Sequence, residues 1–189
     1  MNLPNKLTLL RIILIPVFMV VLYWGFPGAT WVALAIFIIA SLTDMLDGKI
    51  ARKYNLVTDF GKFADPLADK LLTTVALIYM MRDGVCSPVV LCIILAREFA
   101  VSGLRMVAAG AKDGKVIAAN MWGKVKTVLQ MLTIIFYFFG ISLTYGNTVL
   151  GNLNVWLISY WLCWLVAAAT AISGIKYLWD NRSFINTAK

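Results

Sequence analysis

Apolar residues are gathered into long segments that short polar or turn-forming stretches separate. We predict membrane spans over roughly residues 7–25, 30–52, 63–81, 88–109, 125–143 and 153–177. Each segment is near the length of about 20 residues that a helix needs to cross a bilayer. The pattern therefore predicts an all-α membrane protein of six transmembrane helices, with residues 1–189 forming one domain.

The first eleven residues mix apolar side chains with Asn5, Lys6, Thr8 and Arg11. We expect a short interfacial segment that runs into the first span. A signal peptide is the alternative, but no small-residue cleavage site follows, and five more hydrophobic segments come later.

Composition supports the membrane interpretation. Hydrophobic residues make up 61% of the chain and charged residues 14%, against about 45–50% and about 25% in soluble domains. The net charge is +8, and the basic residues follow membrane sidedness rather than one exposed patch, which argues against a nucleic-acid binder. Only Arg82 lies in an outside connection. The positive-inside rule therefore predicts a multi-pass membrane protein with both termini in the cytoplasm.

Residue types that are absent exclude several chemistries. The chain has no histidine, and Cys86, Cys92 and Cys163 form no CxxC pair. Zinc sites and Ser-His-Asp or Cys-His catalysts are therefore not expected. Carboxylates, lysine, arginine or a bound metal must carry any reaction.

Four aspartates dominate the polar positions of the second and third spans. Asp44 and Asp47 are three apart, and Asp65 and Asp69 are four apart. These spacings place each pair on one helix face. The connection between the two helices is short, so we expect neighbouring antiparallel helices whose acidic faces meet at the cytoplasmic side.

An acidic cluster in a bilayer needs compensation, because each unpaired charge costs at least about 2.5–3.5 kcal/mol. Oxygen-only ligands favour Mg²⁺ or Mn²⁺, and two ions about 3.5–4 Å apart would suit phosphoryl chemistry. Two simpler interpretations remain open. Asp44 and Asp47 could end a helix, and Asp65 before Pro66 could cap one. The acids could also serve a divalent-cation transporter, although only two helices carry them.

Small and basic residues lie in register with the aspartates. Gly48, Ala51 and Gly61 leave room for a ligand beside the backbone, and Arg52 offers a planar cation for a diphosphate. Helix glycines on their own are more typical of close helix packing.

Together these residues spell D-x2-D-G-x2-A-R-x8-G-x3-D-x3-D from Asp44 to Asp69. The chain thereby resembles the CDP-alcohol phosphotransferase family, whose members share the six-span layout and are usually homodimers. The resemblance implies that all four aspartates bind two metal ions and that Asp69 is also the general base. It further implies that Gly48, Ala51, Arg52 and Gly61 receive the CDP moiety, and that Asn5 and Thr8 border the nucleotide.

Four further segments narrow the resemblance: MNLPNKLTLLR, GKFADPLADKLL, AREFAVSGLR and GKVKT. They are similar to the bacterial branch that transfers a phosphatidyl group from CDP-diacylglycerol to sn-glycerol 3-phosphate. Sister enzymes that use inositol phosphate, inositol or serine are the alternatives, because the aspartate motif does not name the acceptor.

A dianionic acceptor needs cations near the aspartates. Arg97 and Arg105, eight apart in the fourth span, and Lys124 and Lys126, at the start of the fifth, are the candidates. Glu98 could neutralise Arg97 instead, although adjacent residues on a helix are not expected to face each other. The lysines could anchor the chain or contact anionic lipid, and Arg11 could be an interfacial anchor rather than a site residue.

Overall fold

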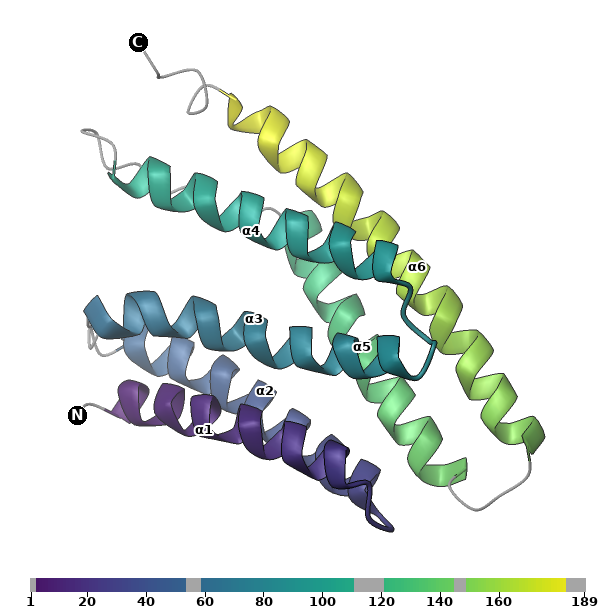
Figure 1. Cartoon of the computed structure of the whole chain (residues 1–189). Coiled ribbons are helices and arrows are strands. Elements are labelled where there is room, and N and C mark those ends of the chain that lie inside the picture. Colours follow the sequence, from purple (N-terminus) through teal and green to yellow (C-terminus); the bar gives the residue numbers. More distant parts are fainter. Residues whose placement is uncertain (1–2, 54–58, 111–120, 145–148, 183–189) are drawn as a thin grey trace. The chain divides into compact units, whose positions relative to one another are not determined.

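The computed structural model describes residues 3–53, 59–110, 121–144 and 149–182. Side chains are described for residues 8–43, 68, 70–108, 121–144 and 154–182. Over these ranges the chain forms six helices and no strand (Figure 1). The helices are α1 (Leu3–Trp24), α2 (Ala29–Lys53), α3 (Asp59–Arg82), α4 (Pro88–Gly110), α5 (Met121–Thr144) and α6 (Val149–Asp180).

The all-helical architecture is confirmed, and each predicted span falls on one helix. Helices α3 and α5 begin four residues before their predicted spans, and α6 is longer at both ends. The hydrogen bonds of a helix continue through positions that lower the local hydropathy. The added first turns of α3, α5 and α6 contain such positions: Asp59, Gly61 and Lys62; Gly123 and Lys124; Gly151 and Asn152. Helix α1 begins at Leu3, so the predicted interfacial segment and the first span form one continuous helix.

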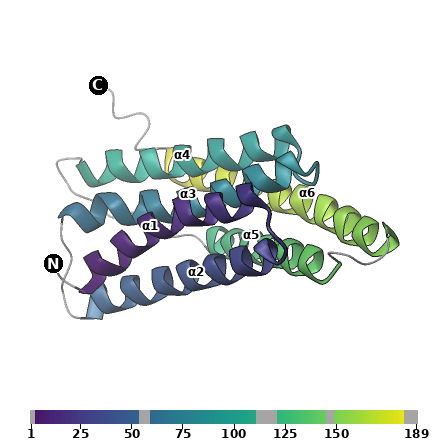
Figure 2. The same cartoon turned by 60° about the horizontal axis from the view of Figure 1, so that its bottom comes forward.

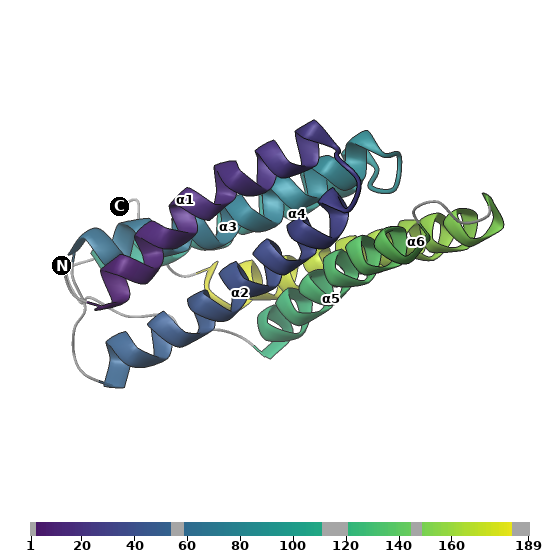
Figure 3. The same ribbon diagram turned by 90° about the horizontal axis from the view of Figure 1, so that it is seen from below.

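The chain divides into two compact units: Met1–Tyr79 with Ile134–Val155, and Met80–Thr133 with Trp156–Lys189. In the first unit α1 and α2 lie side by side as an antiparallel pair (Figure 2). A tight turn joins them at one end of the pair (Figure 3). Gly25 and Gly28 adopt positive φ angles of 59° and 88° there. Such angles suit glycine, which explains the predicted break in the hydrophobic pattern.

Aromatic packing holds the first unit together. The Phe18 ring centroid lies 6.3 Å from that of Phe37 on α2 and 5.7 Å from that of Phe138 on α5. All three side chains are buried. Edge-to-face and tilted rings at these separations are favourable, so the aromatic residues fix α1 against both α2 and the second half of α5.

In the second unit α4 and α6 run in the same direction. Arg97 and Arg105 of α4 bond to Ser173 and Tyr177 of α6, respectively, so the contacts advance together along both helices. Val101, Leu104 and Tyr177 form an apolar cluster between them. This packing places the polar side chains of α4 beside the last turns of α6.

Two helices in the described part are long and apolar enough to cross a membrane: Met121–Thr144 and Asn154–Asp180. The described residues Thr8–Trp24 and Ala29–Thr43 are apolar but shorter. Six spans, their orientation and the single domain therefore stay predictions.

Candidate active site

The four aspartate positions lie on two helices that run in opposite directions (Figure 1). Asp44 and Asp47 fall in the last three turns of α2, and Asp65 and Asp69 in the first half of α3. Both pairs are therefore helical, as their spacing requires. Their side chains lie outside the described part, so the meeting of the two acidic faces stays a prediction.

The other residues predicted to surround the CDP moiety also lie largely outside the described side chains. The side chains of Asn5 and Arg52 are outside the described part, as are the surroundings of Gly48, Ala51 and Gly61. The assignment of Arg52 and the three small residues to the CDP moiety is what the resemblance implies for the motif, and the place of Asn5 beside the nucleotide is likewise only implied by the resemblance.

One polar side chain from α1 lies close to the acidic end of α2. Arg11 is fully buried, and its Nε donates to the backbone carbonyl of Ala40 at 3.4 Å. Ala40 precedes Asp44 by four residues, which is about one helical turn. Thr8, one turn before Arg11, is also buried. Arg11 is therefore not an exposed interfacial anchor, and its Nε bonds to α2 about one turn before Asp44 in the sequence.

The ligand atoms of the four aspartates favour a hard metal ion. Among the described side chains, no three His, Cys, Asp or Glu residues come together. The four aspartates fall outside that set, and they supply only carboxylate oxygens, the ligand type that Mg²⁺ and Mn²⁺ prefer. The donor set therefore fits a hard divalent cation.

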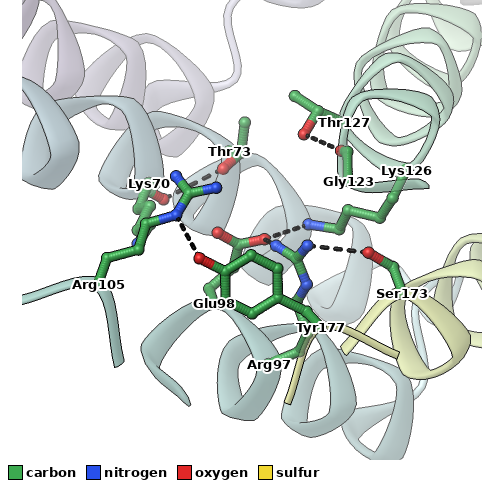
Figure 4. A network of polar contacts seen from close by, with 10 residues as sticks. All are labelled: Lys70, Thr73, Arg97, Glu98, Arg105, Gly123, Lys126, Thr127, Ser173 and Tyr177. Carbon is green, nitrogen blue, oxygen red and sulfur yellow. Dashed lines mark hydrogen bonds and ion pairs between the residues drawn. The ribbon is translucent and has the colours of Figure 1, made fainter. Parts of the chain in front are cut away.

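A polar network joins three helices of the second unit (Figure 4). Lys126 Nζ on α5 donates to Glu98 Oε1 on α4 at 2.5 Å, and Arg97 Nη1 donates to the same oxygen at 3.1 Å. The Lys126 side chain is 3% exposed and that of Arg97 12%. Two cations thus share one carboxylate away from water, where ion pairs are screened little.

Two glycines and a serine enclose Arg97. Arg97 Nη2 donates to Ser173 Oγ at 2.9 Å. A Cβ on Gly174 would come within 2.7 Å of Arg97 Cγ, and one on Gly123 within 3.2 Å of Arg97 Nη2. These glycines on α5 and α6 therefore provide the space that the arginine side chain fills.

The ion pair between Arg97 and Glu98 differs from the expectation for adjacent helix residues. Adjacent helix positions were expected not to face each other, yet Arg97 and Glu98 bond directly. The long arginine side chain can bend around the helix to reach its neighbour, so the spacing rule for short contacts does not apply. The assignment of Arg97 and Lys126 to the acceptor phosphate stays a prediction, but both already share Glu98.

The other two predicted acceptor residues are more accessible. Arg105 is exposed, with its Nε 3.0 Å from Tyr177 Oη and its Cζ 5.4 Å from the Tyr177 ring centroid. Lys124 is also exposed. Within the described residues neither has a carboxylate partner, so both cations are available to an anionic ligand.

Sequence reasoning missed the residues that hold this network. Glu98 was considered only as a neighbour of Arg97, and Ser173, Tyr177 and Gly174 were not singled out. The adjacent small residues Ser173 and Gly174 in an apolar helix are a usable signal, because such residues mark close helix approach. No local pattern connects Glu98 with Lys126, 28 residues further along the chain.

Substitution of Gly174 tests this packing. We expect Gly174→Ala to lower the unfolding temperature, because overpacking of this kind typically costs about 1–3 kcal/mol. Thermal unfolding in detergent is the measurement. Gly103→Ala is the matched control, since a Cβ there meets nothing within 4 Å, and alanine is the better helix former. Equal unfolding temperatures for the two variants would contradict the enclosed position of Arg97.

In the part of the chain that the structure describes, all elements are helices, and two of them carry the paired aspartate positions. The chain belongs to the CDP-alcohol phosphatidyltransferase family, whose family model matches residues 1–176. With the apolar helices α5 and α6, this membership identifies a membrane protein.

Bacterial relatives cover nearly the whole chain. A CDP-diacylglycerol–glycerol-3-phosphate 3-phosphatidyltransferase of Bacillus subtilis (strain 168) is 41% identical over 203 residues, covering 99% of this chain and 98% of the relative. The protein of that name from Rickettsia bellii (strain RML369-C) is 39% identical over 93% of each chain. That of Salmonella typhimurium (strain LT2) is 33% identical, covering 100% of this chain and 95% of the relative.

Proposed function

We propose that the chain transfers the phosphatidyl group of CDP-diacylglycerol to sn-glycerol 3-phosphate, giving phosphatidylglycerophosphate and CMP in phospholipid biosynthesis. The observation that carries this proposal is the shared name of relatives from separate bacterial groups, at 33–41% identity over nearly the full chain. Their names specify both the donor and the acceptor.

The proposal includes the placement of the enzyme in the bacterial cytoplasmic membrane. Six spans, cytoplasmic termini and a site open to the cytoplasm are supported by the distribution of basic residues along the sequence. A homodimer is the assembly that the family resemblance implies. A soluble acceptor such as sn-glycerol 3-phosphate could then reach the aspartates from the cytoplasm.

Asp44, Asp47, Asp65 and Asp69 would hold two Mg²⁺ or Mn²⁺ ions. When bound, such ions supply charge neutralisation for a diphosphate and for the leaving phosphate. The donor set of four carboxylates on two helices supports this assignment.

The residues of the chain have separate tasks in the transfer. Arg52 binds the diphosphate, while Gly48, Ala51 and Gly61 leave space for the CDP moiety. Asp69 accepts the proton of the acceptor hydroxyl, whose oxygen attacks the phosphorus that bears the lipid. The bond from that phosphorus to the bridging oxygen breaks, and CMP leaves with the electron pair. Positioning and charge stabilisation supply most of the rate, as in phosphoryl transfer generally.

The acceptor phosphate is assigned mainly to Arg105 and Lys124. Both are exposed and have no carboxylate partner among the described residues. Arg97 and Lys126 share their charge with Glu98, so they contribute to the potential of the pocket more than to direct contacts. Bidentate arginine bonds suit a phosphate dianion.

An acceptor assay tests the proposed function. Purified enzyme with CDP-diacylglycerol is given sn-glycerol 3-phosphate, inositol phosphate, inositol or serine, and the release of CMP is measured. We expect rapid release with sn-glycerol 3-phosphate alone. Release with another acceptor but none with sn-glycerol 3-phosphate would assign a sister activity. Metal flux into liposomes without CMP formation under any condition would instead favour a cation transporter.

A further inference from the structure

Cation–aromatic pairs gather where α5 begins and α6 ends. Lys176 Nζ on α6 lies 5.8 Å from the ring centroid of Trp122 on α5. One and a half turns further, Arg182 Cζ lies 4.9 Å from the ring centroid of Trp179. Both separations are within the range of about 6 Å for an attractive cation–π contact. Each cation thus lies over the face of an indole ring.

These pairs are exposed. The relative exposure of Trp122 is 48% and that of Trp179 is 67%, and Lys176 and Arg182 are exposed as well. Asp180 is the one carboxylate in the described last turn of α6, and no ion pair joins it to either cation. Among the described residues, neither cation therefore has a carboxylate partner.

An apolar surface continues from the same pairs along α6. Ile175 is 68% exposed and Ile172 is 55% exposed. Both helices in question are those apolar enough to cross a bilayer. Tryptophan favours the membrane interface, with its ring in the apolar layer and its N–H in the wet one. If α6 spans the bilayer, this arrangement would place the two cations near the lipid head groups and the exposed isoleucines toward the acyl chains.

We propose that Lys176 and Arg182, together with Trp122 and Trp179, bind the phosphate of an anionic phospholipid. The arginine fork matches two phosphate oxygens, the lysine adds a point charge, and the exposed isoleucines contact the acyl chains. An intact lipid is the ligand rather than free phosphate, because only a lipid uses the apolar surface as well as the cations. The site depends on the membrane placement of the chain, and it shares no residue with the proposed catalytic or acceptor sites.

Lipid retention tests the proposal. The full chain is extracted into detergent containing equal amounts of phosphatidylglycerol and phosphatidylcholine, and native mass spectrometry counts the lipids that remain bound. We expect the parent protein to retain phosphatidylglycerol preferentially. A Lys176→Gln/Arg182→Gln variant should need about ten-fold more phosphatidylglycerol for the same occupancy, since each interfacial cation attracts anionic lipid measurably.

Matched variants separate this site from general charge effects. Arg82→Gln removes another exposed cation, the last residue of α3, which pairs with Asp83 in the turn that follows, and should leave retention unchanged. The exchange Lys176→Arg/Arg182→Lys keeps both charges and should preserve binding. Each single Gln variant gives the same readout if the double variant is unstable.

Three results would overturn the proposal. Equal retention of the two lipids by the parent protein would show no anionic preference, so the residues would be interfacial anchors only. Unchanged retention in the double variant would place the anionic lipid elsewhere. Displacement of the lipid by millimolar inorganic phosphate would indicate a site for the free anion. CMP release is measured separately, so a failure of the proposed reaction would leave the lipid result interpretable.

Discussion

Replacement of Asp69 by asparagine should abolish turnover while leaving the fold intact. Asparagine has nearly the same shape but cannot take a proton, and loss of a general base typically costs about 10²–10⁴-fold in rate. The expected loss lies at the upper end of that range or beyond, because the same carboxylate is also assigned to the metal. CMP release measures the activity, and thermal unfolding and helical circular dichroism report on the fold.

A matched carboxylate separates this effect from a general loss of charge. Asp83→Asn changes an exposed aspartate just beyond α3 that pairs with Arg82, and activity should stay near that of the parent. Substantial turnover in Asp69→Asn would remove Asp69 as the base. Loss of both activity and helicity would point instead to a structural role, which the restored carboxylate of Asp69→Glu would then test.

The helices could be predicted from the sequence because their signal is local. Six apolar segments predicted six helices, and Pro27 with Gly28 located the first turn. Helix ends were less predictable, since polar residues can continue a helix beyond its apolar part. The extra first turns of α5 and α6 mix apolar residues with Gly123, Lys124, Gly151 and Asn152, so the hydropathy pattern alone does not include them.

One part of the candidate site could be predicted from the sequence, and another part could not. The aspartate motif is visible because its spacing is set within two consecutive helices, so a count along the chain reveals it. The network around Glu98 is not visible, because it joins α4, α5 and α6 at positions far apart in sequence. The burial of a side chain likewise depends on contacts between residues far apart in the sequence. Arg11 resembles an anchor in the sequence, and only packing against α2 shows that it is enclosed.

Removal of divalent metal should eliminate the activity reversibly. Excess chelator is expected to reduce CMP release to background, and Mg²⁺ or Mn²⁺ added back should restore it. The reason is the donor set, since four carboxylates offer hard oxygen ligands and few alternatives to a hard cation. Manganese binding followed by electron paramagnetic resonance provides a readout that does not depend on turnover.

The negative charge of the four aspartates determines the activity expected without metal and the manganese binding expected in the variants. Without a cation, four carboxylates close together would repel one another, and nothing would neutralise the diphosphate of the donor. The metal-free enzyme should therefore be inactive even if acceptor and donor bind. Asp44→Asn and Asp65→Asn should each weaken manganese binding, whereas Asp83→Asn should not. Full activity in excess chelator, or manganese binding that none of the motif variants alters, would contradict a metal site at these aspartates.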